Sequence, residues 1–388
     1  MSEVRVNNLS NENNTGGPTI SGITTFSGTH FFVPPQGDTA SRPQSCPPGS
    51  LRFNTDSAKL EYFRGDTIGW VEIDAELTEE LGGGNGSNAG LGTRGLIAGG
   101  LSSPSNMDNI GFITISTLGD AKDFGNLSQA RYKLYSAGCA SRTRALWGGG
   151  YTQPGQNRDT IDFVTFPTTG DATDFGNLLE TQQEPAAFSN ATRGVWLGGA
   201  PHYDRIQYVT IASTGDSVNF GDATTNAGAR TALASTTRGL VAGGESGTSP
   251  HPYINIIEYV TIATTGDATD FGDLTVKRRF AAGGGNATRG IFASGYSGAP
   301  AGSNIIEFVT IASEGNAVDF GDMTVIATYT GGSSSSPTRM CVYDASSPSV
   351  KSIEKIEIVT TGNGVDFGDT DVAHYAGGSG SSNGHGGL

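Results

Sequence analysis

The sequence predicts an all-β protein, and three observations support that fold class. Glycine and proline are frequent, at 59 and 16 of 388 residues, whereas charged residues make up only 16%. Short runs of β-branched and aromatic residues recur between glycine-rich turns, which is typical of many short strands joined by tight turns. Finally, an internal repeat of about fifty residues covers most of the chain, and such a period indicates a repeat architecture.

Each repeat begins with a Thr-Arg dipeptide and an apolar run, and successive arginines are 50, 49, 45, 51 and 50 residues apart. A second apolar run follows, then a turn of the Thr-Gly-Asp type, then a segment that ends in Asp-Phe-Gly, or Asn-Phe-Gly in one copy. The repeat arginines are Arg94, Arg144, Arg193, Arg238, Arg289 and Arg339. The repeat phenylalanines are Phe124, Phe175, Phe220, Phe271, Phe320 and Phe367.

The second apolar run indicates how the repeats pack. In residues 306–311 one strand face carries Ile306 and Phe308, and the other carries Val309 and Ile311. A strand alternates its side chains between its two faces, so a sheet with this pattern is apolar on both sides. We therefore predict a six-bladed β-propeller with four strands, a to d, in each blade. The Thr-Arg run is strand b, the second run strand c, the Asp-Phe-Gly stretch strand d, and the segment before Thr-Arg, as in 279–284, strand a.

The end of the chain is predicted to close this ring. A seventh Thr-Arg at the 19-residue distance from Phe124 to Thr143 would fall at position 386, so residues 372–378 are expected to be an unpaired strand a. We predict that they complete the first blade, whose own strand a is missing or weakly supplied by the glycine-rich residues 81–92. The sixth repeat departs from the others at Asp344, Lys355 and Glu357. This blade is expected to pack more loosely or to meet something polar.

Residues 1–80 do not share the repeat. Residues 7–27 are rich in Asn, Thr, Gly and Ser, and short strands are expected at 51–53, 60–63 and 70–73. Three short strands bury little surface, so this β-meander is expected to need partners, most simply other copies of the chain. The predicted organisation is therefore an N-terminal attachment and oligomerisation module at 1–80, a glycine-rich linker at 81–92, and the propeller at 93–388.

Two sequence patterns resemble proteins of tailed bacteriophages. Residues 51–56, 60–62 and 70–72, with the sequences Leu-Arg-Phe-Asn-Thr-Asp, Leu-Glu-Tyr and Trp-Val-Glu, resemble a small module near the N-termini of phage fibre and structural proteins. The Ile-Glu-Tyr-Val-Thr-Ile and Gly-Asp-Ala-Thr-Asp-Phe-Gly-Asp repeat resembles kelch-like repeats in virion proteins of such phages, including cyanophages. The resemblance implies a host-facing virion protein, often trimeric through its N-terminal part.

Charge and composition exclude several kinds of partner. The net charge of −15 disfavours nucleic acid and anionic membrane surfaces. No apolar stretch reaches the ~20 residues needed to span a bilayer, and the N-terminus lacks a signal-peptide pattern. We therefore expect a protein made in the host cytoplasm and located in the virion. The three cysteines and five histidines show no disulfide or metal spacing, so no metal or cofactor is expected.

Catalytic interpretations find little support in the sequence, and we expect no enzyme activity. A kinase has one Asp-Phe-Gly in a defined context, whereas here the motif repeats once per blade. No sialidase aspartate box is present, although two carboxylates suffice for a glycosidase, which leaves hydrolase activity as a minor alternative. The turn aspartates match no calcium loop. The repeat arginines could bind an anion, but their recurrence in every repeat favours a structural role.

A recognition surface is expected on the loops between strands b and c, which differ in every repeat. They span 102–109, 152–160, 201–205, 245–255, 297–304 and 345–352, and variable loops on a regular scaffold commonly carry binding. Aromatic residues there suit sugar stacking, although they could instead only shield the blade tops. The candidate binding residues are Tyr151, His202, Tyr203, His251, Tyr253 and Tyr296. Two functions remain open: a fibre that binds a host surface glycan or protein, and a structural head, neck or connector protein that binds other virion proteins.

Overall fold

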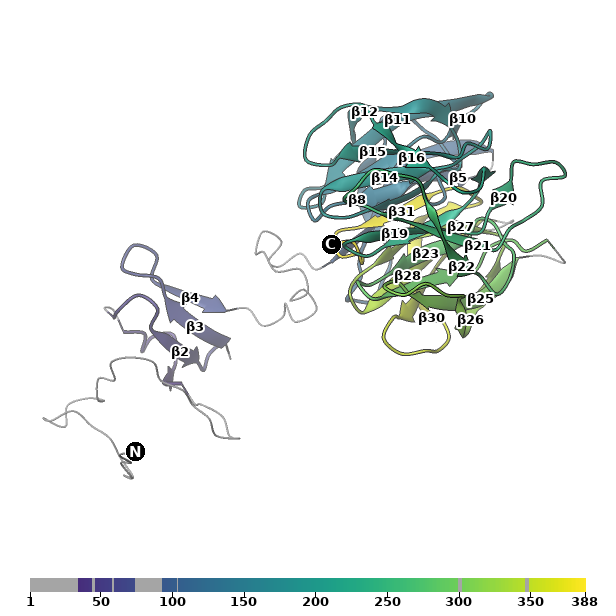
Figure 1. Cartoon of the computed structure of the whole chain (residues 1–388). Helices are drawn as coiled ribbons and strands as arrows, with labels where there is room; N and C mark the ends of the chain where they lie inside the picture. Colours follow the sequence, from purple (N-terminus) through teal and green to yellow (C-terminus); the bar gives the residue numbers. More distant parts are fainter. Residues whose placement is uncertain are drawn as a thin grey trace, which may run out of the picture. The chain divides into compact units, whose positions relative to one another are not determined.

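The computed structural model describes residues 34–43, 46–57, 59–73, 93–102, 104–298, 302–345 and 349–388. Within these ranges all regular elements are strands, and none is a helix that could cross a membrane. The chain divides into two compact units, Met1–Ala75 and Glu76–Leu388, and Figure 1 shows both. The segment 7–27 and the predicted linker 81–92 lie outside the described residues, as do positions 103, 299–301 and 346–348 of the variable loops.

The N-terminal unit contains one sheet in the order β1-β2-β3-β4. Its strands are β1 (Gln36–Gly37), β2 (Leu51–Asn54), β3 (Lys59–Phe63) and β4 (Trp70–Ile73). The last three are the predicted meander and are antiparallel, while β1 adds a short parallel pair with β2. The turn after β2 is an Asx turn, because the Asn54 side chain accepts a hydrogen bond from the Asp56 N–H at 3.0 Å.

The larger unit contains six antiparallel sheets of four or five strands in the described part of the chain, here numbered 1 to 6. Sheet 1 comprises β31 (Ser379–Ser382), β5 (Arg94–Ser102), β6 (Ser105–Thr114) and β7 (Lys122–Asn126). Sheet 2 comprises β8 (Gly138–Ala140), β9 (Arg144–Gly148), β11 (Gln156–Thr165) and β12 (Thr173–Gln182), with β10 (Tyr151–Thr152) beside β11. Sheet 3 comprises β13 (Ala186–Ser189), β14 (Arg193–Leu197), β15 (Arg205–Thr210) and β16 (Val218–Asp222).

Sheet 4 comprises β18 (Thr231–Ala234), β19 (Arg238–Ala242), β21 (Ile256–Thr261) and β22 (Thr269–Asp273). A short pair, β17 (Ala227–Gly228) with β20 (Glu245–Ser246), lies near it in sequence. Sheet 5 comprises β23 (Ala282–Gly285), β24 (Arg289–Ala293), β25 (Ser303–Thr310) and β26 (Val318–Ala327). Sheet 6 comprises β27 (Tyr329–Ser335), β28 (Arg339–Ala345), β29 (Val350–Glu357) and β30 (Val365–His374).

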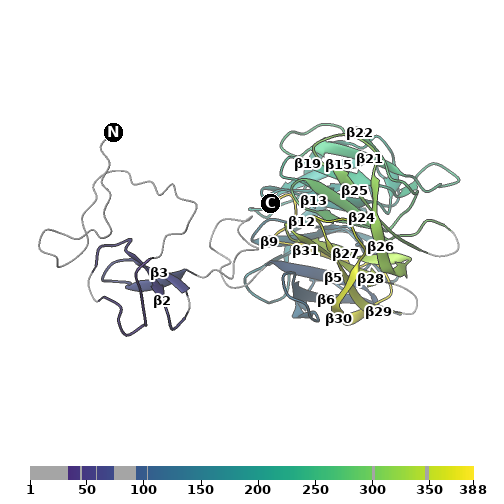
Figure 2. The same cartoon turned by 90° about the horizontal axis from the view of Figure 1, so that it is seen from below.

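The first strands of the six sheets form a closed ring. Strand β8 contacts β13, and contacts then run through β18, β23, β27 and β31 back to β8. Within each sheet the Thr-Arg run is the second strand and the Asp-Phe-Gly segment the fourth, as the sequence predicted. In Figures 1 and 2 the C-terminal strand β31 lies beside β5, which begins the unit. Antiparallel sheets arranged in this way are consistent with a β-propeller.

The closing strand lies later in the chain than we predicted. Residues 372–374 belong to β30, and Ala376 makes only an isolated bridge, whereas β31 pairs with β5 from Ser379↔Ala98 to Ser382↔Gly95. The reason is a left-handed residue before the strand, Gly377 with φ 72°. In sheet 5, Phe280 with φ 58° has the same place, and β23 likewise begins later than the predicted 279–284. The strand cannot begin until the chain has passed this turn.

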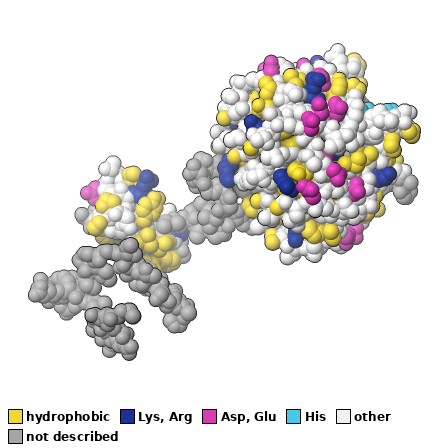
Figure 3. Space-filling view, viewed as in Figure 1, with side chains coloured by type: hydrophobic (Ala, Val, Ile, Leu, Met, Phe, Trp, Pro, Cys, Tyr) yellow, Lys and Arg dark blue, Asp and Glu magenta, His cyan; other side chains and the backbone are white. Residues whose placement is uncertain are grey.

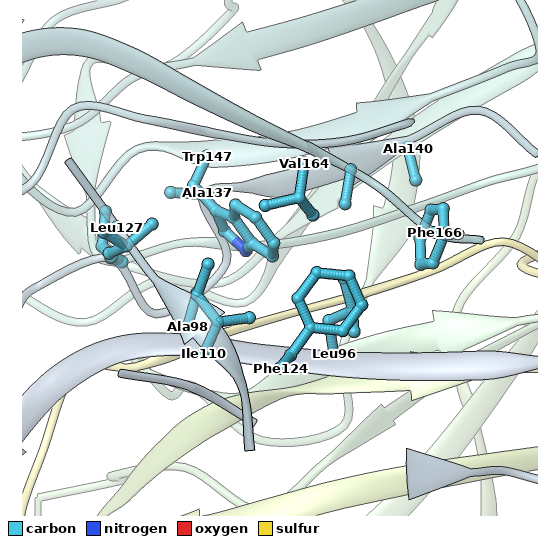
Figure 4. Close-up of a cluster of buried hydrophobic side chains, with 12 residues drawn as sticks. Leu96, Ala98, Ile110, Phe124, Leu127, Ala137, Ala140, Trp147, Val164 and Phe166 are labelled. Atoms are coloured by element: carbon cyan, nitrogen blue, oxygen red, sulfur yellow. The ribbon is translucent and has the colours of Figure 1, made fainter. Parts of the chain in front are cut away.

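Apolar side chains fill the spaces between the sheets. Figure 4 shows one such cluster, in which Leu96 and Phe124 of sheet 1 pack against Trp147 and Val164 of sheet 2. All six repeat phenylalanines are buried, and in sheets 1 to 5 each contacts the aromatic residue of its own third strand edge-on. Such edge-to-face pairs add to the free energy gained by burial.

Each repeat arginine joins its sheet to the next one. Arg144 donates a hydrogen bond to the Ile211 carbonyl at 3.0 Å, and Arg339 of sheet 6 donates to the Ile115 carbonyl of sheet 1 at 2.8 Å. The other four donate in the same way to Phe166, Ile262, Ile311 and Ile358. In sheets 1 to 5 the guanidinium also lies over the third-strand aromatic, within 4.5 to 5.0 Å of the ring centre. These contacts favour a structural role.

Candidate functional site

Two kinds of connection emerge at one end of the strands. Because successive strands in each sheet are antiparallel, the loop from the second to the third strand emerges beside the connection that enters the first strand. We call this end of the unit the recognition face. All six candidate binding residues lie in its loops or at their edges, with Tyr151 in β10.

A guanidinium is surrounded by aromatic rings on this face. Arg279 lies over the ring of Tyr253 at 5.0 Å, of Phe280 at 4.7 Å and of Tyr296 at 5.5 Å. The two tyrosine rings are 5.7 Å apart at 69°, and Arg279 forms an ion pair with Glu245. Both tyrosines are partly exposed. This arginine cluster combines apolar ring surface with fixed charges of both signs, which is a suitable composition for binding polar ligands.

A second cluster on this face is arranged in the same way around a lysine instead of an arginine. The Lys133 ammonium lies over Tyr151 at 5.1 Å and over Tyr132 at 5.9 Å, and the two rings meet edge-on at 5.5 Å. Its Nζ is 3.5 Å from the Glu184 carboxylate. Burial raises the pKa of Glu184, and the charges of Lys133 and Arg279 oppose that rise. The pKa of Glu184 therefore depends on both cations.

Aromatic residues between the two clusters form a hub. Tyr135 and Phe280 are buried with ring centres 4.4 Å apart, and Tyr329 packs on them at 6.2 and 5.1 Å. Tyr375 lies 6.4 Å from Tyr329, and both of these are partly exposed. Tyr135 and Phe280 have φ 37° and 58°, a region that costs energy for bulky side chains. We infer that packing within the hub maintains this backbone conformation.

Two histidines of the face also come together. The rings of His202 and His251 stack at 5.2 Å and 15°. Burial lowers the pKa of His202, His251 lowers it further, and Glu245 acts in the opposite direction. Among the described ring contacts Tyr203 takes part in none.

Several residues of the face were missed by sequence reasoning. They are Tyr132, Lys133, Glu184, Arg279, Tyr329 and Tyr375. All six lie at or near the connection that enters the first strand, whereas the candidates came only from the loops between the second and third strands. The antiparallel order places both kinds of connection at one end, and that signal was available in the sequence.

A small cavity lies among the first strands. Its volume is about 60 Å³, and Tyr135 and His385 are among its lining residues. Tyr135 precedes β8, while the His385 Nε2 lies 3.0 Å from the Ala140 carbonyl at the other end of that strand. Ligand sites for small molecules typically occupy ~300 Å³ or more, so this cavity is too small for a sugar. Nor could any group of three His, Cys, Asp or Glu residues in the described ranges hold a metal ion.

The turn carboxylates that could have suggested calcium have partners within the protein. The Asp171 carboxylate accepts a hydrogen bond from the Asn126 N–H at 2.9 Å. Equivalent contacts are made by Asp216, Asp267, Asn316, Asn363 and Asp120. These bonds link each turn to the fourth strand of the preceding sheet.

Comparison with known proteins gives no family for the chain. No protein-family model matches it, and no curated protein matches it significantly.

Proposed function

We propose that the chain is a bacteriophage virion fibre whose larger unit, a six-bladed kelch-like propeller, binds a host surface glycan through the recognition face. The N-terminal unit anchors the protein to the virion. The observation that carries the proposal is the gathering of partly exposed tyrosines around Arg279 and Lys133 on one face. The sequence resemblance to phage proteins supports the virion assignment.

The chemistry of the face suits a carbohydrate. Tyrosine rings stack on the apolar faces of sugars, and their hydroxyl groups bond to sugar hydroxyls at the rim. Arg279 and Lys133 are each paired with a glutamate, so the two clusters carry no large net charge. A neutral or zwitterionic site of this kind favours hydroxyl-rich ligands over strongly charged ones. The proposal requires binding and no catalysis.

The test is binding of the full chain to surface polysaccharide extracted from marine cyanobacteria. The variant Tyr253→Ala with Tyr296→Ala is expected to lose at least tenfold in affinity while its melting temperature stays within a few degrees. The matched control is Tyr208→Ala with Tyr259→Ala, which removes two tyrosines that also contact arginines but lie on third strands. Equal affinity of wild type and the first variant contradicts the proposal. Binding of purified virion proteins instead would favour the structural alternative.

A further inference from the structure

Several sheets of the larger unit bury an ion pair at the same place. In sheets 2 and 5 an arginine seven residues after the repeat phenylalanine pairs with a carboxylate on the third strand. In sheet 4 the arginine comes ten residues after the phenylalanine and forms an equivalent ion pair. All side chains are at most 1% exposed in the pairs Arg131–Asp162, Arg230–Glu258 and Arg278–Glu307. Each buried anion is therefore balanced by a buried cation, without which its burial is costly.

In sheets 1 and 3 both partners of this pair are replaced together. Sheet 3 has Gln182 and Gln207 at the two positions, and the Gln207 side chain accepts the Leu179 N–H at 2.7 Å. Sheet 1 has His374 and Gly111. Burial lowers the pKa of His374 to about 4, so this ring is neutral at pH 7. Neither sheet keeps the third-strand acid after losing the arginine.

Sheet 6 keeps the acid without the arginine. Ala327 stands seven residues after Phe320, and Glu354 holds the third-strand position. Asp344 adds a second carboxylate, and both acids are at most 1% exposed. Figure 3 shows acidic and basic side chains interspersed on one face of the larger unit, where water and salt screen their charges. The two buried acids of sheet 6 have no such screening, and among the described ion pairs neither has a cation.

The two acids lie together on one face of sheet 6. Glu354 pairs with Val342, and Asp344 follows Val342 by two residues, so the carboxylates are diagonal neighbours. Diagonal neighbours are about 7–8 Å apart, a distance that side chains can bridge. Both oxygens of Asp344 are buried without a hydrogen-bond partner. A buried carboxylate in this state needs a proton or a cation beside it.

A cation has a precedent at this place in the other sheets. The guanidinium in sheets 2, 4 and 5 also donates to the main-chain carbonyl five residues after the repeat arginine, which belongs to Gly149, Gly243 and Ser294. In sheet 6 the residue at that position is Asp344. Its carboxylate therefore comes from the same position at which the other three sheets hold a positive charge.

We propose that sheet 6 binds one calcium ion between the carboxylates of Asp344 and Glu354, where sheets 2, 4 and 5 hold a guanidinium. Two carboxylates balance a divalent charge, which a sodium ion would only half neutralise. Calcium takes carboxylate, carbonyl and hydroxyl oxygens in flexible geometry, whereas magnesium keeps several waters, which this buried position does not favour. The Ser352 hydroxyl, close enough to lower the pKa of Asp344, is a further oxygen donor. Unlike the repeat turns, whose carboxylates have partners within the protein, this site joins two strands.

The ion connects the two ends of the sixth variable loop. Strand β28 ends at Ala345 and β29 begins at Val350, so Asp344 precedes the loop and Glu354 follows it. The ion competes with a proton, because the pKa of Asp344 is about 7. Calcium binding involves no residue of the tyrosine clusters, so its test does not depend on the proposed recognition of a glycan.

The experiment titrates calcium chloride into the full chain at pH 8 by calorimetry, after a chelator has been added and removed. One ion per chain is expected, with a Kd on the order of 10⁻⁴ M. Calcium at about 100 times that Kd should raise the melting temperature by about 5 °C. At pH 6 the affinity should fall about tenfold, because Asp344 then carries a proton.

Three variants locate the ion. Asp344→Asn keeps the shape of the side chain and should lower the calcium affinity at least tenfold. Asp171→Asn, the control, removes a turn carboxylate whose place Asn316 takes in another sheet, and should bind calcium like wild type. Ala327→Arg supplies the missing guanidinium, and should raise the melting temperature of the calcium-free protein while weakening calcium binding. No calcium binding by wild type, or equal affinity in wild type and Asp344→Asn, overturns the proposal.

Discussion

Sheets 2, 4 and 5 neutralise a buried carboxylate differently from sheet 6. In the first three, a carboxylate on the third strand pairs with a buried arginine from the connection entering the first strand. These pairs are Arg131–Asp162, Arg230–Glu258 and Arg278–Glu307. In sheet 6 the equivalent carboxylate, Glu354, accepts hydrogen bonds from the Thr324 and Val325 N–H groups at 2.8 and 2.9 Å. Among the described ion pairs Glu354 has no arginine partner.

Sheet 6 also buries a second carboxylate, that of Asp344. Asp344 lies diagonally from Glu354 on the same face of the sheet, is 0% exposed, and neither of its oxygens has a well-formed hydrogen bond. Burial and then the charge of Glu354 raise the pKa of Asp344 to about 7, with Ser352 acting in the opposite direction. In sheet 6 backbone N–H groups therefore hold the third-strand carboxylate, and the raised pKa of Asp344 on the second strand indicates that a proton neutralises this additional acid below pH 7. In the sixth repeat, which is expected to pack more loosely or to meet something polar, the acid Asp344 is buried.

The largest effect on stability is expected from removing one of the arginines that pair with a buried carboxylate in sheets 2, 4 and 5. Arg278→Met leaves Glu307 buried without its cation, and losing one partner of a buried pair costs about 3–5 kcal/mol of unfolding free energy. Urea unfolding of the full chain measures the loss. Arg278→Met combined with Glu307→Gln should recover much of it. A single variant within 1 kcal/mol of wild type would show that the pair is not a buried ionic contact.

A pH-dependent effect is expected at Asp344. Its folded pKa, about 7, lies above the ordinary aspartate value of 3.8, so its contribution to stability is present below pH 3.8 and is lost as the pH rises through 7. In calcium-free buffer, Asp344→Asn should therefore stabilise the protein above pH 7, by at most about 4 kcal/mol relative to wild type. At pH 3.5 the two proteins should unfold alike. Identical pH profiles would contradict proton neutralisation in sheet 6.

The partly buried His385 should respond to pH with the opposite sign. Burial lowers the pKa of His385 from 6.5 to about 4, and its Nδ1 accepts the Gly387 N–H at 3.1 Å while Nε2 faces carbonyl and hydroxyl oxygens. Its stabilising effect is full above pH 6.5 and is lost as the pH falls through 4, at most about 3 kcal/mol. Thermal unfolding from pH 7 to 4 tests this: His385→Asn should flatten the wild-type decline, and an equally steep profile in the variant would rule it out.

The smallest expected effect is a difference in unfolding free energy between variants of the repeat arginines of sheets 5 and 6. Arg289 lies 4.6 Å from the centre of the Phe308 ring, whereas Arg339 has Lys355 in place of that aromatic and pairs with the 45% exposed Glu357. Both donate to carbonyls of the next sheet. Arg289→Ala should cost about 1 kcal/mol more than Arg339→Ala, the contribution of a cation–π contact. Equal unfolding free energies for the two variants would remove that contribution.

Much of the fold follows from residues that repeat. The phenylalanine of Asp-Phe-Gly and the arginine of Thr-Arg recur at nearly constant spacing, and they mark the fourth and second strands of all six sheets. The closing strand was predicted at 372–378 from the repeat pattern, whereas the left-handed residue, Gly377, sets where the strand begins. The residue type at this position differs from sheet to sheet, for example Gly377 in sheet 1 and Phe280 in sheet 5. The repeat pattern therefore did not reveal the left-handed backbone conformation.

The site was predictable in part. Aromatic residues in variable loops identified Tyr151, Tyr253 and Tyr296, but not the cations beside them. Lys133 and Arg279 lie in the connections that enter first strands, whereas those tyrosines lie in other loops. Only the folded ring of sheets brings the cations and the rings together. In the N-terminal sheet, alternation along β2 and β3 places Arg52 and Glu61 on one face and Leu51, Phe53, Leu60 and Tyr62 on the other. It does not show that the segment around 38–43 covers the face of Arg52 and Glu61.

The most direct test of the recognition face is hydrogen exchange of the full chain with and without surface polysaccharide from marine cyanobacteria. Slower exchange is predicted at 130–135, 245–254, 279–280 and 296, where the tyrosine, lysine and arginine clusters lie. The turns between third and fourth strands, at the opposite end of the sheets, should exchange at the same rate in both samples. Protection confined to those turns, or no protection anywhere at saturating polysaccharide, would contradict the assignment of this face.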